Sequence, residues 1–174
     1  MVPKGLMGTQ KMKFEIDTAD FLKIDDIELS ELLTQVYVAG GYTEPDEAAS
    51  LFEASAVRKR GMLIGARETH QLRLAGIVIV VPPDSPARRL AQNNEAEIHL
   101  LGVKPEYRRH GLGRLLVESA IARAKHSGYT KIILWTQNSM DSAQKLYEVM
   151  GFIHVDDITR NGRDFKVYEM ALGA

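Results

Sequence analysis

Residues 97–114 read Glu-Ile-His-Leu-Leu-Gly-Val-Lys-Pro-Glu-Tyr-Arg-Arg-His-Gly-Leu-Gly-Arg. The segment 97–103 is mostly apolar and stops before Pro105, which predicts a buried strand closed by a residue that cannot donate to the ladder. Gly111 and Gly113 stand directly before a segment, 115–124, whose apolar residues recur at helical spacing. The sequence therefore predicts a strand, a glycine loop and the N-terminus of a helix in succession.

A glycine loop that opens onto a helix is suited to binding an anion. Backbone N–H groups point outward there, the helix dipole adds positive potential, and the missing Cβ atoms let a phosphate approach the main chain. Arg108, Arg109 and Arg114 add formal positive charge. A Gly-x-Gly pair can also serve only a tight turn, so its neighbours decide the interpretation. A dinucleotide fingerprint needs a glycine where Leu116 stands, and the Gly-Lys-Ser/Thr triplet of a P-loop is absent.

The remaining pattern is Val-x-Pro-x-x-Arg-x-x-Gly-x-Gly, formed by Val103, Pro105, Arg108, Gly111 and Gly113. It resembles the acetyl-CoA-binding motif of the GNAT family of N-acetyltransferases. The resemblance implies acetyl-CoA as co-substrate, with its pyrophosphate held by the loop residues Arg108, Arg109, His110, Gly111, Leu112, Gly113 and Arg114. It also implies main-chain contacts to the pantetheine arm from Leu101 and Val103.

A second segment, 143–152, is similar to the family's later motif, a helix that carries a tyrosine and ends in Gly-Phe. The resemblance implies that Tyr147 protonates the departing thiolate, because a phenol with a pKa near 10 keeps its proton at neutral pH. The family usually has an asparagine seven residues before that tyrosine. This chain has Met140 there, with Asn138 nearby, so the pantetheine contact of that asparagine is not expected in the usual form.

Acyl transfer to an amine also needs a proton acceptor. A lysine-like amine is mostly protonated at pH 7, and freeing its lone pair costs about 4 to 5 kcal/mol. Glu97 is the predicted base, acting directly or through water, and Glu95 and His99 are alternatives on the same nominal face of the strand. A bulge in the strand would change the choice, and a half-exposed structural carboxylate is an equally good interpretation of Glu97. Gly102 either loosens local packing or admits the acyl group.

Hydrophobic periodicity predicts eleven strands and helices along the whole chain, in the order β-α-α-β-β-β-α-β-α-β-β. Thr18 or Asp20 is the expected cap of the first helix, and one continuous second helix is expected from Thr43 to about Arg60. An Asn161-Gly162 turn should join the last two strands. This order predicts an α/β fold with a mixed, mostly antiparallel sheet and helices on both faces, which is also the order of the GNAT acyl-CoA N-acyltransferase fold.

Composition limits the class of protein. At 174 residues the chain fits one domain, expected over 14–174 after a flexible lead-in, 1–13. The net charge of −1 gives no reason to expect nucleic acid or a membrane as partner. Cysteine is absent, which fits a reducing, cytoplasmic location and excludes a cysteine acyl-enzyme. The histidines show no metal-ligand spacing, so no metal is expected.

These observations lead to one functional prediction. We expect a cytoplasmic N-acetyltransferase that moves an acetyl group from acetyl-CoA directly to a primary amine, with a small molecule or a protein as acceptor. A non-catalytic acyl-CoA-binding sensor or regulatory module is the alternative. The sequence does not identify the acceptor, and a terminal strand at the sheet edge could pair with a second copy to give a homodimer.

Overall fold

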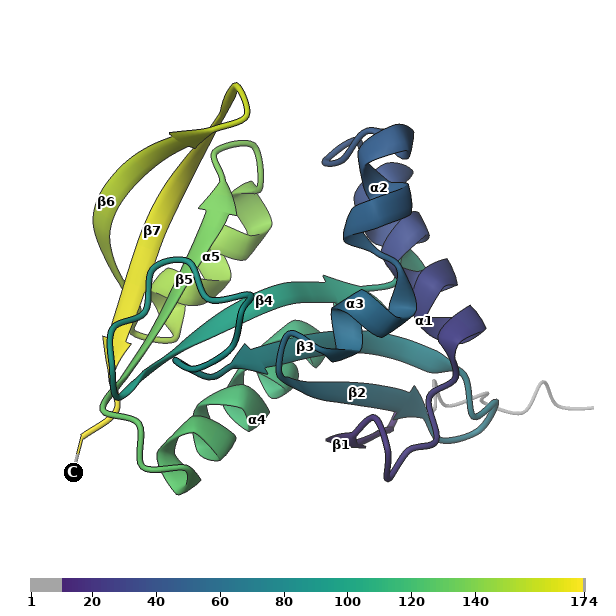
Figure 1. Ribbon diagram of the computed structural model, residues 1–174. Helices are drawn as coiled ribbons and strands as arrows, with labels where there is room; N and C mark the ends of the chain where they lie inside the picture. Colours follow the sequence, from purple (N-terminus) through teal and green to yellow (C-terminus); the bar gives the residue numbers. More distant parts are fainter. Residues whose placement is uncertain (1–10, 174) are drawn as a thin grey trace, which may run out of the picture.

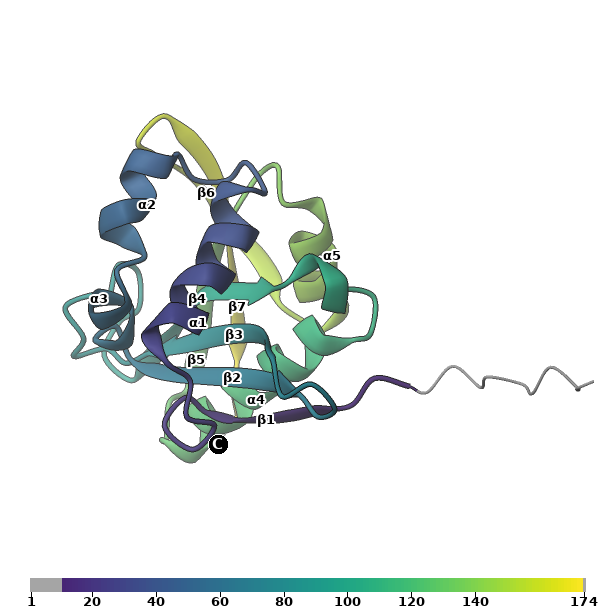
Figure 2. The same cartoon turned by 90° about the vertical axis from the view of Figure 1, so that its right-hand side faces the viewer.

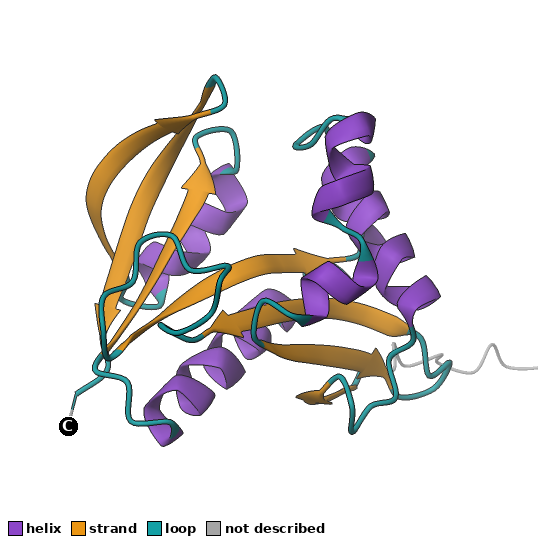
Figure 3. Ribbon diagram, viewed as in Figure 1, coloured by secondary structure: helices purple, strands orange, loops and turns teal. Residues whose placement is uncertain are grey.

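The computed structural model describes residues 11–173, which form one seven-stranded sheet covered by helices on both faces (Figures 1 and 3). The strands are β1 (Phe14–Thr18), β2 (Met62–Glu68), β3 (Leu74–Val81), β4 (Glu95–Val103), β5 (Lys131–Gln137), β6 (Ile153–Arg160) and β7 (Arg163–Ala171). The helices are α1 (Asp26–Leu33), α2 (Pro45–Leu51), α3 (Ala54–Arg58), α4 (Leu112–His126) and α5 (Asp141–Val149). A π-helical turn, η1 (Thr34–Val38), continues α1, and a 3-10 turn, η2 (Pro105–Tyr107), follows β4.

The sheet has the order β1-β2-β3-β4-β5-β7-β6. All neighbouring strands are antiparallel except β4 and β5. The predicted fold class, a mixed and mostly antiparallel α/β sheet with helices on both faces, is therefore confirmed. The Asn161-Gly162 turn between β6 and β7 is also confirmed, with both residues at positive φ, as such a hairpin requires.

Each face of the sheet carries its own apolar core. Every residue of β3 is buried, and its side chains alternate between the two faces. Val78 and Val80 pack with α4 and α5, whereas Ile77 and Ile79 pack with α1, α2 and α3. Figure 2 shows α1 and α2 on the opposite side of the sheet from α4. The central strand of the seven, β4, lies between these two layers.

The helices before β2 differ from the prediction. The expected helix from Thr43 to Arg60 is interrupted after Leu51, because Phe52 turns inward to be buried and Glu53 caps a new helix through the N–H groups of Ser55 and Ala56. The cap of α1 is Asp25, which forms a capping box with Glu28, and not Thr18 or Asp20.

Strand β4 has two irregularities that shape the molecule. A bulge lies between His99 and Gly102, because these residues pair with Ile79 and Ile77, and Leu100 has a φ of 51°. On its other side, β4 pairs with β5 only over Glu95–Glu97, and the two strands then diverge (Figure 1). The divergence opens the sheet from Ile98 onward.

The predicted lead-in, residues 1–13, lies mostly outside the described residues; 11–13 are irregular. Within the described part of the chain, no helix has both the length and the apolar composition that a membrane crossing requires.

Candidate active site

A cavity of about 620 Å³ lies where β4 and β5 diverge. Its walls come from η1 and α2 on one side, from β4 and β5 in the middle, and from α5 and the β6–β7 hairpin on the other side. Because the sheet is open at this point, side chains from both of its faces reach the same space. The cavity is therefore accessible to groups carried on either face of the sheet.

Glu97 does not line this cavity. Its side chain is 0% exposed, and its Oε1 accepts hydrogen bonds from the backbone N–H groups of Arg89 (2.8 Å), Ala91 (2.7 Å) and Leu90. Its Oε2 lies 2.7 Å from Nε2 of His99. Burial acts to raise the pKa of Glu97, but the hydrogen bonds from His99 and from the loop N–H groups outweigh it and hold the pKa below its usual value. Glu97 is thus a carboxylate that orients the 89–91 segment and His99.

His99 does line the cavity, although it is only 8% exposed. Burial lowers the pKa of His99 and outweighs the opposing effect of Glu97, so the ring is neutral at neutral pH. A carboxylate can only accept, so Nε2 must carry the proton and Nδ1 the lone pair. The edge of the ring packs against Trp135 with 4.8 Å between centroids. Nδ1 can therefore accept a proton, and the contacts with Glu97 and Trp135 fix the orientation of the ring.

Tyr147 reaches the cavity from the opposite face of the sheet, where α5 carries it. The side chain is 5% exposed and packs on Phe152 and Tyr168. Burial raises the pKa of Tyr147, so the phenol keeps its proton at all physiological pH values. Every fully enclosed side-chain nitrogen or oxygen within 11–173 has a hydrogen-bond partner, and the Tyr147 hydroxyl has none, so this hydroxyl is open to the cavity.

The predicted glycine loop begins where β4 ends. Gly111 is the N-cap of α4 with φ of 75°, and no side chain caps the helix. The first intrahelical bond is donated by Leu115, so the preceding N–H groups of the first turn, including those of Leu112, Gly113 and Arg114, lack helical partners. Arg108, Arg109 and His110 are exposed beside them. The loop thus presents free N–H groups and positive charge, as the sequence predicts.

The main chain of β4 beyond the bulge lies between the cavity and this loop. The Leu101 carbonyl accepts a hydrogen bond from the Tyr37 hydroxyl (2.9 Å), and the Val103 carbonyl accepts one from Nε of Arg108 (3.0 Å). A Cβ at Gly102 would lie 3.4 Å from Val36 of η1. Gly102 therefore faces the helix layer, and its small size serves packing there.

The other candidates lie outside the centre of the cavity. Glu95 binds the N–H of Gln92 and pairs with Lys131 at the surface. Met140 lines the cavity in the place of the expected asparagine, and Asn138 is exposed. No cluster of three or more histidine, aspartate or glutamate side chains in the described residues is arranged to hold a metal ion.

The model of the Acetyltransferase (GNAT) family matches residues 27–152, which contain both the glycine loop and the Tyr147 helix. The chain belongs to the GNAT family. The matched residues include the two segments whose motifs resemble this family, the glycine loop after β4 and the helix that carries Tyr147.

Curated acetyltransferases are similar to this chain over part of their length. The chain is 34% identical over 80 residues to N-acetyltransferase family 8 member 3 of Rattus norvegicus, covering 46% of this chain and 34% of that protein. It is 27% identical over 162 residues to the mycothiol acetyltransferase of Kocuria rhizophila, covering 88% of this chain and 50% of that protein. The chain thus spans half or less of the length of these relatives.

Solved structures of acetyltransferases share the fold. The ribosomal-protein-S18-alanine N-acetyltransferase of Escherichia coli superposes with a TM-score of 0.68 at 18% identity, over 93% of this chain and 96% of that chain. A Bacillus subtilis acetyltransferase in complex with CoA superposes with a TM-score of 0.62 at 23% identity, over 92% and 99% of the two chains. At these identities the likeness is one of fold.

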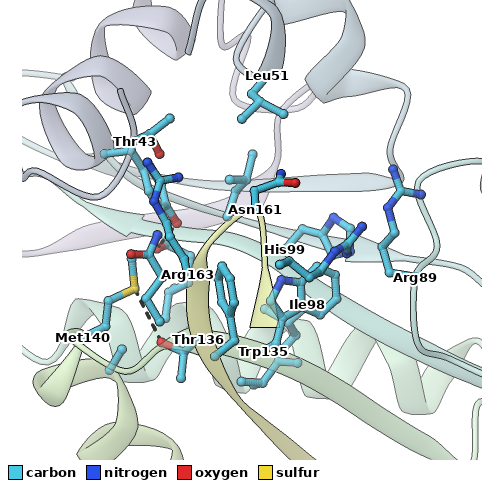
Figure 4. A pocket seen from close by; sticks show the side chains of 18 of the residues that line it. Thr43, Leu51, Arg89, Ile98, His99, Trp135, Thr136, Met140, Asn161 and Arg163 are labelled. Atoms are coloured by element: carbon cyan, nitrogen blue, oxygen red, sulfur yellow. Dashed lines mark hydrogen bonds between the residues drawn. The ribbon is translucent and has the colours of Figure 1, made fainter. Parts of the chain in front are cut away.

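The structure also brings residues to the cavity that the sequence did not single out as site residues. Arg60 and Arg89 lie on its wall together with Arg160 and Arg163 of the β6–β7 hairpin. Figure 4 labels Arg89 and Arg163. In the sequence, Arg60 and Arg89 each stand in an ordinary pair of charged residues, which more often marks a solvated surface. Only the folded loop between β3 and β4 brings them together.

Proposed function

We propose that the protein is an acetyl-CoA-dependent N-acetyltransferase that transfers the acetyl group directly to a primary amine in a ternary complex. The observation that carries the proposal is the convergence of a neutral histidine and a protonated tyrosine on one cavity, from opposite faces of an opened sheet. Membership of the GNAT family and the names of the N-acetyltransferase relatives support the same reaction.

The glycine loop would bind the pyrophosphate of acetyl-CoA. The free N–H groups at the start of α4 and the exposed side chains of Arg108 and Arg109 supply hydrogen-bond donors and positive charge. The edge of β4 that faces away from β3 has no strand partner after Glu97 in the described sheet. It would give the pantetheine arm main-chain groups at Leu101 and Val103, along a path from the loop to the cavity.

His99 would act as the general base and Glu97 as its positioning residue. Nδ1 of His99 accepts the proton that the amine loses as its nitrogen bonds to the acetyl carbon. The positive charge that develops on the ring is stabilised by the Glu97 carboxylate at 2.7 Å. Glu97 thereby acts through His99 and does not itself contact the amine.

Tyr147 would act as the general acid. As the carbon–sulfur bond breaks, the electron pair stays on sulfur, and the Tyr147 hydroxyl donates its proton to the thiolate. Transfer of the His99 proton to solvent and reprotonation of Tyr147 complete the cycle, and the products are an amide and free CoA. Since the chain has no cysteine, an acyl-cysteine intermediate is excluded.

Calorimetric titration with acetyl-CoA, followed by a free-thiol release assay over a panel of amines, tests the proposal. Arg108→Glu should weaken acetyl-CoA binding by about tenfold or more. Lys125→Glu, at the exposed C-terminal end of the same helix, makes the same charge change and should leave binding unchanged. Binding without amine-dependent thiol release would favour a sensor, and absence of acetyl-CoA binding would overturn the proposal.

A further inference from the structure

The wall of the cavity beside His99 carries an unusual concentration of positive charge. The charged lining residues are four arginines, Arg60, Arg89, Arg160 and Arg163, and one glutamate, Glu47. Glu47 is already paired with Arg163 at 3.0 Å. Within 11–173, no carboxylate lies within 4.0 Å of the guanidinium of Arg60 or Arg89. The chain as a whole has a net charge of −1, so this positive region is local.

Hydrogen bonds to backbone carbonyls hold the guanidinium groups of Arg60 and Arg89. Arg89 is exposed, and its Nη1 donates to the carbonyls of Pro86 and Arg88, at 3.1 Å each. Nη2 of Arg60 donates to the Leu51 carbonyl (2.7 Å), and the Arg60 carbonyl accepts a hydrogen bond from the Ser85 hydroxyl (2.7 Å). Ser85 belongs to the loop that also carries Arg89, whose backbone N–H is fixed by Glu97. The carboxylate that orients His99 therefore also fixes the loop that brings the second arginine to the cavity.

The charge of Arg89 acts on Arg60, and both arginines act on His99. Burial lowers the pKa of Arg60, Tyr37 opposes this effect, and the charge of Arg89 adds to the lowering. Both arginines also contribute to lowering the pKa of His99, after the larger effect of burial. Two like charges beside a neutral imidazole, without an anion from the protein, are electrostatically unfavourable. A bound anion would relieve this repulsion.

Acetyl-CoA is not the natural source of that anion. Its phosphates would bind at the glycine loop, which follows Val103 at one end of β4, whereas Arg89 is tied to Glu97 near the other end. Six residues of strand separate Glu97 from Val103, which corresponds to roughly 20 Å. Arg60 and Arg89 therefore face the acceptor side of the cavity, next to the base (Figure 4 labels Arg89 and His99).

We propose that Arg60 and Arg89 bind a carboxylate of the acceptor, so that the preferred acceptor is an amine with a free carboxylate close to the reacting nitrogen, as in an α-amino acid. A guanidinium presents two parallel N–H donors that match the two oxygens of a carboxylate. Binding of that group beside His99 places the neighbouring amine at Nδ1. This assignment of the acceptor class rests on the proposed acetyltransferase function.

Matched acceptors test the assignment. Thiol release is measured for a panel of amino acids, for their amides and for the corresponding amines that lack the carboxyl group, with the side chain constant within each set. We expect kcat/KM for the acid to exceed that for its amide by about 10- to 100-fold in at least one set. Turnover of amides or simple amines as fast as the acids would overturn the assignment and leave the transferase function intact. A stronger preference for the aminophosphonate analogue would overturn the choice of carboxylate.

Variants link the preference to the two arginines. Arg89→Gln should reduce the ratio of acid to amide turnover by about tenfold, because it removes one charged partner and keeps the backbone bond to Glu97. Arg60→Gln should do the same, and both substitutions together should abolish the preference. Arg88→Gln is the matched control, because Arg88 is adjacent to Arg89 and exposed like it, but does not line the cavity. An unchanged ratio in Arg89→Gln and Arg60→Gln, with acetyl-CoA affinity also unchanged, would overturn the proposal. Failure of the unmodified protein to bind acetyl-CoA would instead overturn the proposed transferase function.

Discussion

Replacement of Glu97 by glutamine separates the positioning of His99 from the rest of the site. In the protein, Oε1 of Glu97 accepts three backbone N–H bonds and Oε2 accepts the Nε2–H of His99. An amide has only one oxygen. If that oxygen stays with the loop, the amide NH₂ faces His99, so Nε2 must become the acceptor and the ring proton must move to Nδ1. The variant therefore removes the lone pair that would receive the proton of the amine.

The contacts of Glu97 set the expected losses in the free energy of unfolding and in kcat. If each of the three loop bonds falls from about 2 to about 1 kcal/mol on losing the charge, the free energy of unfolding falls by at most about 3 kcal/mol. The variant avoids part of the cost of burying a charge, which reduces this loss. A domain of this size remains folded after such a change. Loss of a general base lowers kcat by about 10²- to 10⁴-fold.

The assay combines kinetics with a direct view of the tautomer. We expect Glu97→Gln to keep its acetyl-CoA affinity, to lose kcat for amine acetylation, and to exchange the ¹⁵N chemical shifts of protonated and unprotonated nitrogen in His99. Glu95→Gln is the control, since Glu95 lies two residues earlier on the same strand and interacts with Gln92 and Lys131 instead. Wild-type kcat in Glu97→Gln, together with a changed tautomer, would refute the role of His99 as base.

Three further outcomes follow from the same geometry. Because the pKa of His99 lies below its ordinary 6.5, kcat/KM should fall on acidification with a midpoint below pH 6.5. The free energy of unfolding should also fall from about pH 6.5 downward, since His99 takes up a proton in the unfolded chain at a higher pH than in the folded protein. A midpoint above that value would contradict the assignment. Tyr147→Phe should lower kcat about 100-fold or more with little change in acetyl-CoA affinity. Tyr37→Phe should cost only about 1 kcal/mol of stability, through the lost hydrogen bond to the Leu101 carbonyl. Equal losses of kcat in the two variants would argue against Tyr147 as the general acid. Gly111→Ala should lower the free energy of unfolding by about 1 to 2 kcal/mol because of its φ of 75°, as measured by urea denaturation, and a neutral result would show that the loop relaxes.

Local sequence signals predicted most of the fold. The strand before Pro105, the glycine loop and helix α4 follow one another in the chain, so short-range periodicity and turn chemistry define them. The break between α2 and α3 was not predicted. No glycine or proline marks it, and it depends on burial of Phe52 in the core formed with α1 and η1, which are remote in the sequence.

The site was predictable only in part. Glu97 and His99 are two residues apart on one strand, so their common face was expected, but which of them reaches the cavity depends on the loop that surrounds Glu97. That loop has no periodicity and contains prolines, so its path could not be read from the sequence. The approach of Arg60 to Arg89 depends on the same path. Tertiary contacts therefore form the side of the site proposed for the acceptor, whereas local sequence motifs form the side proposed for the cofactor.

The divergence of β4 and β5 also has a consequence for hydrogen exchange. Only the Glu95–Glu97 segment of β4 is paired with β5, so backbone amides beyond it that point toward β5 should exchange quickly with solvent in the free protein. A pantetheine arm bound along this edge would take the place of the missing strand partner and slow that exchange. The same binding would stabilise the native state by about 2.7 kcal/mol when ligand is present at 100 times its Kd. In the proposed complex the substrate would take the place of the missing strand, and the melting temperature should rise with the concentration of acetyl-CoA.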